Sequence, residues 1–280
     1  MRVKTTHSIL VGDARQMLSV PDGSVQLVMT SPPRWGDTRC KQKNGIGSEK
    51  TFEDYNNSLN PVWKECHRIL APGGRMRVQA SDQLTQSSRG EGKRMLPVRA
   101  EIVCFCESIG LDHMGGIVCG DRMPGSFSEK DLKKEMQSDF RDWAVGQDCT
   151  FVLLFRKPGR REKTDTGIKG RSEIRAKKWN ECFCGHWSFR KRKKGSAMKG
   201  SDTEIAKRCI RMFSFAGDTI LDPFSRDGTT IFAAHDCRRS SIAYTSRSAE
   251  ARKVVEAASN PEKRIGGKRN FQIIRKEEKR

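Results

Sequence analysis

Short apolar runs alternate with longer segments of helical spacing along most of this 280-residue chain. Residues 25–29 (VQLVM) form a continuous apolar run that ends at Ser31-Pro32-Pro33, which is typical of a buried strand. Residues 55–70 place apolar side chains at helical spacing and end at Ala71-Pro72-Gly73-Gly74. Strands and helices that alternate in this way, separated by glycine and proline, predict an α/β fold with a largely parallel sheet.

The alternation continues at both ends of the chain. Further strands are expected at residues 7–11, 75–80, 151–155, 219–221 and 241–244, and further helices at 98–109, at 204–213 and from Gly228-Thr229-Thr230 onward. The pattern breaks between residues 124 and 200. More than half of the net positive charge is concentrated there, because residues 156–199 hold sixteen Lys or Arg against four Asp or Glu.

The charge balance separates the possible classes of partner. Lys and Arg number 54 against 34 Asp and Glu, so the formal net charge is +20. A field of that sign favours a polyanionic partner, with nucleic acid ahead of an anionic membrane surface. No apolar run approaches the length of a membrane-spanning helix, and the first residues lack the pattern of a cleavable signal. The ten cysteines are scattered, so we expect reduced thiols in a cytoplasmic protein.

A first motif with chemical potential follows the strand expected at residues 25–29. Ser31-Pro32-Pro33 stands where a parallel strand ends, and α/β sheets place their binding sites at that end. Two prolines fix the backbone, so the Ser31 hydroxyl and the Pro32 carbonyl become rigid acceptors. Such acceptors suit hydrogen bonding to an exocyclic amine whose lone pair points at an electrophile. Taken alone, the motif is more often a proline-stiffened strand exit.

A second motif follows the strand expected at residues 219–221. Asp222-Pro223-Phe224 precedes Gly228-Thr229-Thr230, which opens a predicted helix. A strand, a tight turn and a helix N-terminus form a common platform for nucleotide cofactors, because free backbone N–H groups there attract a carboxylate or a phosphate. The alternative is an ordinary β-to-α turn with an Asp-Pro bend.

Together the two motifs carry a family resemblance. The chain resembles the amino-DNA methyltransferases, in the subgroup whose catalytic motif precedes the cofactor motif. The resemblance covers nearly the whole chain except the basic middle and the tail, and it includes residues 12–33, 69–74 (ILAPGG), 154–159 (LFRKPG) and 216–224 (AGDTILDPF). Serine before the two prolines is more similar to the cytosine-N4 branch than to the adenine-N6 branch. The resemblance implies a Rossmann-like, mostly parallel methyltransferase sheet with an inserted basic target-recognition region.

The resemblance also implies a reaction. A cytosine is flipped out of double-stranded DNA, and its N4 amine attacks the methyl group of S-adenosylmethionine while Ser31 and Pro32 accept hydrogen bonds from it. The residues implied in catalysis are Ser31, Pro32, Pro33, Arg34 and Trp35. The residues implied in binding S-adenosylmethionine are Asp13, Asp222, Pro223, Phe224, Arg226, Gly228, Thr229 and Thr245. Asp13 is explained nearly as well as a residue that caps a turn.

Three positions depart from the family pattern. An aromatic residue usually follows Pro-Pro, where this chain has Arg34 and then Trp35. In the loop that usually reads Phe-x-Gly-x-Gly, Arg226 adds bulk, although its charge suits the methionine carboxylate. The acid expected after the next strand, to bind the ribose hydroxyls, is replaced by hydroxyl side chains that include Thr245. Two alternatives therefore stay open: a weak or inactive DNA-binding relative on the same fold, and adenine-N6 specificity.

The basic middle of the chain is expected to contact DNA. The run Arg190-Lys191-Arg192-Lys193-Lys194 is flanked by Trp and Phe residues and stands where the family carries its target-recognition region. Phosphate contacts dominate affinity for DNA, so we assign this run to the DNA backbone, although such runs are usually solvated surface. Cys182, Cys184 and His186 lack a second pair of ligands, so we expect no metal site.

These inferences divide the chain into four parts. Residues 1–123 form the catalytic part of the methyltransferase domain, 124–200 the target-recognition region, 201–258 the cofactor-binding part and 259–280 a loose basic tail. The expected setting is a prokaryotic restriction–modification system. Its partners would be double-stranded DNA and a cognate restriction endonuclease, with the protein acting as a monomer or dimer in the cytoplasm, associated with the nucleoid.

Overall fold

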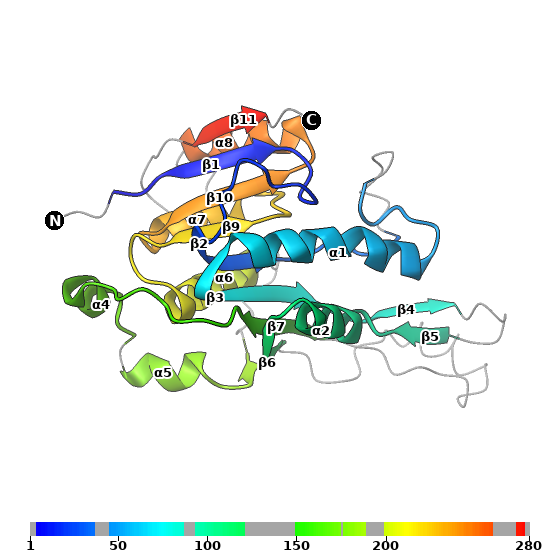
Figure 1. Cartoon of the computed structure of the whole chain (residues 1–280), viewed down its shortest axis with the longest axis horizontal. Helices are drawn as coiled ribbons and strands as arrows, with labels where there is room; N and C mark the ends of the chain where they lie inside the picture. Colours follow the sequence, from blue (N-terminus) through cyan, green and yellow to red (C-terminus); the bar gives the residue numbers. More distant parts are fainter. Residues whose placement is uncertain are drawn as a thin grey trace.

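A nine-stranded sheet is the framework of the described part of the protein (Figure 1). The structure is a computed structural model that describes residues 4–36, 45–86, 93–120, 149–174, 176–188, 199–259 and 273–277. The strands of the sheet are β1 (His7–Val11), β2 (Val25–Thr30), β3 (Leu70–Ala80), β6 (Asp112–Cys119), β7 (Thr150–Arg156), β8 (His186–Trp187), β9 (Thr219–Asp222), β10 (Ser240–Thr245) and β11 (Ile274–Glu277). A separate hairpin consists of β4 (Gln83–Gln86) and β5 (Lys93–Leu96).

The sheet is mostly parallel, as the sequence predicts. Its strand order is β11-β1-β10-β9-β2-β3-β7-β6-β8, and β7 alone runs antiparallel to its described neighbours β3 and β6. The carboxyl ends of the parallel strands therefore meet at one edge. There Val11 pairs in register with Thr245, Ala243 with Asp222, and Thr30 with Val78.

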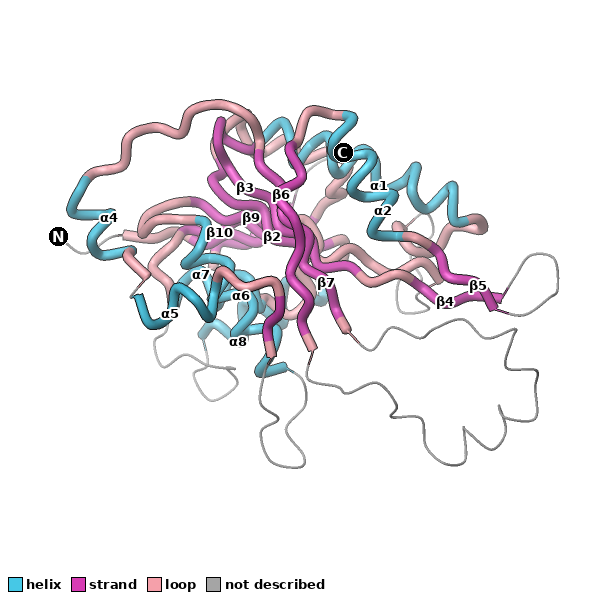
Figure 2. The backbone as a smooth tube through the Cα atoms, turned by 90° about the horizontal axis from the view of Figure 1, so that it is seen from below, coloured by secondary structure: helices cyan, strands magenta, loops and turns pink. Residues whose placement is uncertain are grey.

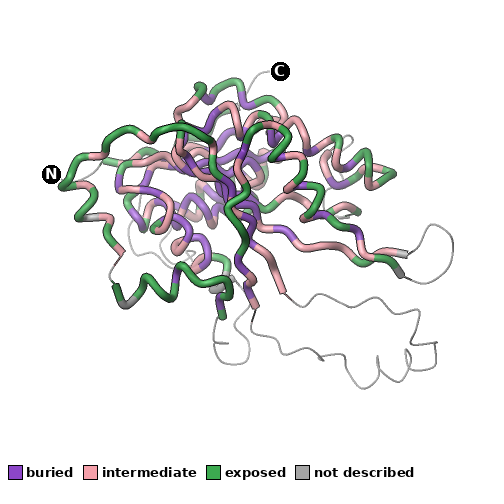
Figure 3. The backbone as a smooth tube through the Cα atoms, turned by 60° about the horizontal axis from the view of Figure 1, so that its bottom comes forward, coloured by how far each residue is buried: buried purple, intermediate pink, exposed green. Residues whose placement is uncertain are grey.

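Helices cover both faces of the sheet (Figure 2). On one face lie α1 (Phe52–Ile69) and α2 (Val98–Ser108), and on the other lie α6 (Lys199–Phe213), α7 (Thr229–Asp236) and α8 (Ser248–Ser259). The central strands are largely buried (Figure 3). On β2, Val28 packs toward α1 while the next residue, Met29, packs toward α6. This two-sided burial explains the continuous apolar run at residues 25–29.

Helix α1 illustrates how the sequence sets a local element. The Thr51 hydroxyl caps it by accepting a hydrogen bond from the backbone N–H of Asp54 (3.0 Å). Its buried side chains, which recur at helical spacing, are Tyr55, Leu59, Val62, Trp63, Cys66 and Ile69. Burial of this stripe against the sheet stabilises a helix that propensity alone leaves marginal.

Several elements differ from the expectations. The prediction of a loose C-terminal tail is wrong for Ile274–Glu277, which forms β11 and pairs with β1. Without this pairing, β1 would expose an edge of unpaired backbone groups. Strand β3 begins at Leu70 rather than at residue 75, so the Ala71-Pro72-Gly73-Gly74 segment already belongs to it. The expectations also omitted β6 and α8.

Part of the basic middle lies far from the carboxyl edge. Beyond β7 the chain forms the short helices α4 (Thr166–Ser172) and α5 (Ala176–Cys182). Arg161 forms an ion pair with Asp218 (3.2 Å), and the Ser172 hydroxyl accepts a hydrogen bond from the Ala216 N–H (2.9 Å). Both partners precede β9, so this segment is anchored at the amino ends of the parallel strands. No helix in the described part of the chain is both long and apolar enough to span a membrane.

Candidate functional site

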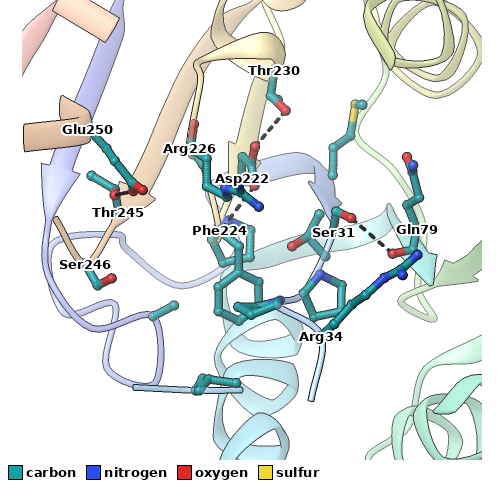
Figure 4. Close-up of a pocket in the computed structure, with 18 of the residues that line it drawn as sticks. Ser31, Arg34, Gln79, Asp222, Phe224, Arg226, Thr230, Thr245, Ser246 and Glu250 are labelled. Carbon is teal, nitrogen blue, oxygen red and sulfur yellow. Dashed lines mark hydrogen bonds between the residues drawn. The ribbon is translucent and has the colours of Figure 1, made fainter. Parts of the chain in front are cut away.

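A large cavity opens at the carboxyl edge of β1, β10, β9, β2 and β3 (Figure 4). Its volume is about 1360 Å³. It brings together segments that lie nearly two hundred residues apart in the chain. The predicted site residues that line it are Asp13, Ser31, Pro32, Pro33, Arg34, Asp222, Pro223, Phe224, Arg226, Thr229 and Thr245. Trp35 and Gly228 lie outside its lining.

The turn after β2 presents Ser31 to the cavity. Ser31 is exposed, and its Oγ donates a hydrogen bond to the backbone carbonyl of Gln79 on β3 (3.3 Å; Figure 4). The hydroxyl of Tyr55 on α1 donates to the Pro33 carbonyl (2.8 Å) and thereby fixes the far side of the turn. Because the Ser31 proton is directed at Gln79, the lone pairs of Oγ stay available to an incoming donor.

The two residues that follow the prolines separate. Arg34 is exposed and lines the cavity. The indole of Trp35 instead packs against Phe52, and its Nε1 donates to the Glu49 carbonyl (3.0 Å). In this structure Arg34, rather than Trp35, is the side chain placed to stack on a ligand beside Ser31.

Asp222 forms the buried centre of the second motif. Its Oδ1 accepts from the Phe224 N–H (3.1 Å), and its Oδ2 accepts from the Thr230 hydroxyl (2.7 Å). Burial raises the pKa of the carboxyl to about 6, although these two hydrogen bonds oppose the shift. The carboxylate is therefore a fixed part of the turn, with one edge facing the cavity.

The last residue of the loop, Gly228, supports close packing. It has a left-handed φ of 74° and caps α7, and a Cβ there would lie 2.6 Å from Val254 Cγ1. Any other residue would force the Val254 side chain on α8 to shift, and its Cβ would strain the left-handed backbone. The next turn is held by Asp227, whose Oδ1 accepts from both the N–H (3.1 Å) and the hydroxyl (2.7 Å) of Thr229.

A carboxylate missed by the sequence analysis stands beside Thr245. The Thr245 hydroxyl donates to Glu250 Oε2 (2.7 Å), and both side chains line the cavity (Figure 4). Glu250 lies in the first turn of α8, five residues beyond the position where the acid was expected. The signal available in the sequence was an acid in the first turn of the helix that follows the strand.

Comparisons with known proteins agree with this geometry. Residues 25–256 match the family model N6_N4_Mtase, described as DNA methylase. The chain belongs to this DNA methylase family. A type II methyltransferase of Methanothermobacter thermautotrophicus, M.MthZI, is 30% identical over 86% of this chain and 73% of its own length. M.MjaI of Methanocaldococcus jannaschii is 29% identical over 97% of each protein.

Two solved structures are similar to this chain. TTHA0409 of Thermus thermophilus, solved in complex with S-adenosyl-L-methionine, superposes with a TM-score of 0.74 and 27% identity over 97% of this chain and 98% of that protein. The cytosine-N4-specific PvuII DNA methyltransferase matches with a TM-score of 0.59 and 17% identity over 89% of this chain and 87% of its own. The second likeness shows the fold alone.

Asp13 of the methylase is engaged locally. Its carboxylate accepts from the Arg15 N–H (2.9 Å) and forms an ion pair with the Arg15 guanidinium (2.6 Å). The structure thus shows the turn-capping arrangement, in a residue that also lines the cavity.

Other cavity residues that sequence reasoning missed come from β3 and α6. Arg77 and Gln79 face the cavity from β3, and Asp202 and Ala206 face it from the start of α6. Nothing in the sequence marks them, because they lie outside the two motifs and meet only when β3 pairs with β2.

The remaining predictions concern the basic middle. Arg190, Lys191, Arg192, Lys193 and Lys194 lie outside the described residues, so their contact with DNA stays a prediction. Cys182 is buried, and the Cys184 thiol donates to the His186 carbonyl (3.0 Å). Among the residues described, no group of three or more His, Cys, Asp or Glu is placed to hold a metal ion.

Proposed function

We propose that this methylase transfers a methyl group from S-adenosylmethionine to the exocyclic N4 amine of a cytosine flipped out of double-stranded DNA. The observation that carries the proposal is that the Ser31-Pro32-Pro33 turn and the Asp222 platform open into one cavity. Ser31 in place of Asp or Asn supports cytosine over adenine. The type II methyltransferases among the relatives support DNA as the substrate.

The cavity residues fit S-adenosylmethionine. Glu250, oriented by Thr245, offers acceptors to the ribose hydroxyls, in place of the acid expected at the strand end. Gly228 keeps the loop close to α8, and Thr229 and Thr230 at the N-terminus of α7 line the cavity wall. When bound, the cofactor supplies an electrophilic methyl group on a sulfonium.

The chain's own residues position the nucleophile. The Ser31 hydroxyl and the Pro32 carbonyl accept hydrogen bonds from the N4 amine, which pulls electron density onto its nitrogen and aims the lone pair across the cavity. Tyr55 and the two prolines hold these acceptors before the base arrives, so little reorganisation is needed. As the amine takes the methyl group, the methyl–sulfur bond would break and leave its electron pair on sulfur as a neutral thioether. The amine would release one proton past Ser31 to solvent, which reaches that exposed side chain.

The base identity is tested by product analysis. The protein is incubated with unmethylated genomic DNA and isotope-labelled S-adenosylmethionine, and the DNA is digested to nucleosides for mass spectrometry. We expect label in N4-methyldeoxycytidine. Label in N6-methyldeoxyadenosine would overturn the cytosine assignment and leave the methylase assignment intact. A folded protein that binds the cofactor but labels neither base would favour an inactive, DNA-binding relative.

The proposal extends to the biological setting. We expect the Arg190–Lys194 run to contact the DNA backbone and residues 124–200 to contribute to target recognition. A cognate restriction endonuclease, cleaving the same site when unmethylated, would complete a type II system of the kind that the relatives' names indicate. We place the protein in the cytoplasm with the nucleoid, as a monomer or dimer.

A further inference from the structure

A buried arginine faces the cavity one strand away from Ser31. Arg77 on β3 is 5% exposed, and its Nη2 donates to the side-chain oxygen of Gln79. Within the described residues, no acceptor hydrogen-bonds to its Nε. Burying a charged group with an unused donor is costly, because the group loses its hydrogen bonds to water. Such a group is explained most simply by a ligand that completes its hydrogen bonds.

The surroundings of Arg77 indicate what kind of ligand fits. Arg77 pairs in register with Met29 on β2, on the face of the sheet covered by α6. Asp202, at the start of α6, is hydrogen-bonded to Gln79 and interacts electrostatically with Arg77, as does Asp222 at the end of β9. One cation and two carboxylates therefore line the same part of the cavity. An α-amino acid group, which carries one carboxylate and one ammonium, matches this arrangement of charge.

We propose that the Arg77 guanidinium binds the carboxylate of the methionine part of S-adenosylmethionine, with Asp202 and Asp222 toward its ammonium. The inference rests on the proposed function, because it assigns a subsite within the proposed cofactor cavity. Arg226 carries the same charge within the motif, but it is exposed. A buried guanidinium makes a stronger contact than an exposed one, since less solvent screens it.

Two other ligands fit Arg77 less well. DNA phosphates stay on the outside of the duplex, whereas Arg77 is buried on the cavity wall. The flipped base is held at Ser31, which contacts Gln79, and Arg77 lies two residues earlier on the same strand, about 7 Å deeper into the sheet. A base-reading role remains distinguishable by experiment, because it would change methyl transfer without changing the response to the cofactor carboxylate.

The test compares two ligands that differ in one group. Dissociation constants are measured by calorimetry for S-adenosylmethionine and for its decarboxylated form, which keeps the adenosine, the sulfonium and the amine. The wild-type protein should prefer S-adenosylmethionine by roughly tenfold or more, the scale of a lost charge-assisted hydrogen bond. In Arg77→Gln the preference should fall to about threefold or less, because the carboxylate has lost its partner.

A matched control is Arg75→Gln. Arg75 lies on the same face of β3 and also has an unpartnered buried nitrogen within the described structure, but it does not line the cavity, so the variant should keep the wild-type preference. Thermal unfolding verifies that each variant folds. If Arg77→Gln fails to fold, Arg77→Met is the second uncharged variant, and its preference should fall in the same way.

The outcomes separate this inference from the proposed function. A wild-type protein that binds both ligands equally, or a preference that survives in every folded Arg77 variant, overturns the assignment of Arg77 alone. Loss of methyl transfer in Arg77→Gln with an unchanged preference does the same and indicates a base-reading role. A wild-type protein that binds neither ligand overturns the cofactor assignment, and the Arg77 inference with it.

Discussion

The catalytic turn and the cofactor platform reach the same cavity by different routes. At the turn after β2, the groups that matter are consecutive: a hydroxyl and a carbonyl on Ser31-Pro32-Pro33. At the platform, the charges come from several elements, with Asp222 from β9 and Glu250 from α8. The acceptors of the turn depend on a rigid backbone, so they must lie within one short motif. The charges of the platform depend only on where each side chain ends, so a carboxylate can reach the same point from a neighbouring helix.

The largest expected effect breaks the turn. Ser31→Ala removes an acceptor that acts on the amine as it reacts. The activation free energy of methyl transfer should therefore rise by about 3 kcal/mol, which lowers the rate roughly a hundredfold, with cofactor binding unchanged. Single-turnover rates with saturating DNA measure the change. Ser81→Ala is the control, because Ser81 also lines the cavity but bonds only to the Cys149 carbonyl (3.3 Å) in the described structure. Equal rates for wild type and Ser31→Ala would remove Ser31 from the mechanism.

The parts of the fold that sequence reasoning predicted share one property. Strands such as β2 and helices such as α1 carry their own signal, because burial on two faces or along one stripe appears directly as periodicity. Strand β11 carries none: residues 274–277 are mostly charged, and their pairing depends on the free edge of β1. Contacts that depend on a distant partner leave no local pattern to recognise.

A smaller effect tests the platform through stability. The pKa of Asp222 is raised to about 6 by burial, so between the unfolded value near 4 and about 6 the folded state binds the extra proton. Its contribution to stability is therefore lost as the pH rises through that window. Asp222→Asn cannot titrate, so its free energy of unfolding relative to wild type should rise by about 2 to 3 kcal/mol from pH 4 to pH 7. Denaturant unfolding at each pH measures it. A constant difference would show that the carboxyl is ionised throughout.

The relocated carboxylate provides the next test. Glu250→Gln keeps the size of the side chain but weakens its acceptors, so the dissociation constant for S-adenosylmethionine should rise roughly tenfold, or about 1.4 kcal/mol. Glu204→Gln serves as the control, because Glu204 pairs with Arg208 (3.2 Å) outside the cavity lining. If Glu250→Gln binds the cofactor as tightly as wild type, the ribose acceptor lies elsewhere. The platform would then not depend on a carboxylate supplied by α8.

The site shows the same limit of sequence reasoning as the fold. Ser31 and Asp222 were predicted from motifs whose spacing is local. Glu250 and Arg77 were missed, since one lies on the following helix and the other on a strand that reaches the cavity only by pairing with β2. The sequence indeed has no acid at residue 245. The cavity nevertheless contains a carboxylate at this place, because the Thr245 hydroxyl orients Glu250.

The smallest expected effect concerns Arg226, where the motif departs most from the family pattern. Its side chain is exposed at the rim, so a contact with the cofactor would be screened by solvent and worth less than about 1 kcal/mol. Arg226→Gln removes the charge and keeps most of the bulk, whereas Arg226→Gly removes both. We expect each variant to change the dissociation constant for S-adenosylmethionine by less than about fivefold. A large gain in Arg226→Gly alone would show that the side chain obstructs the site. An equal, large loss of affinity in both variants would assign the carboxylate contact to Arg226 instead of Arg77. The residue that binds the carboxylate would then lie within the cofactor motif, just as the acceptors of the turn lie within theirs.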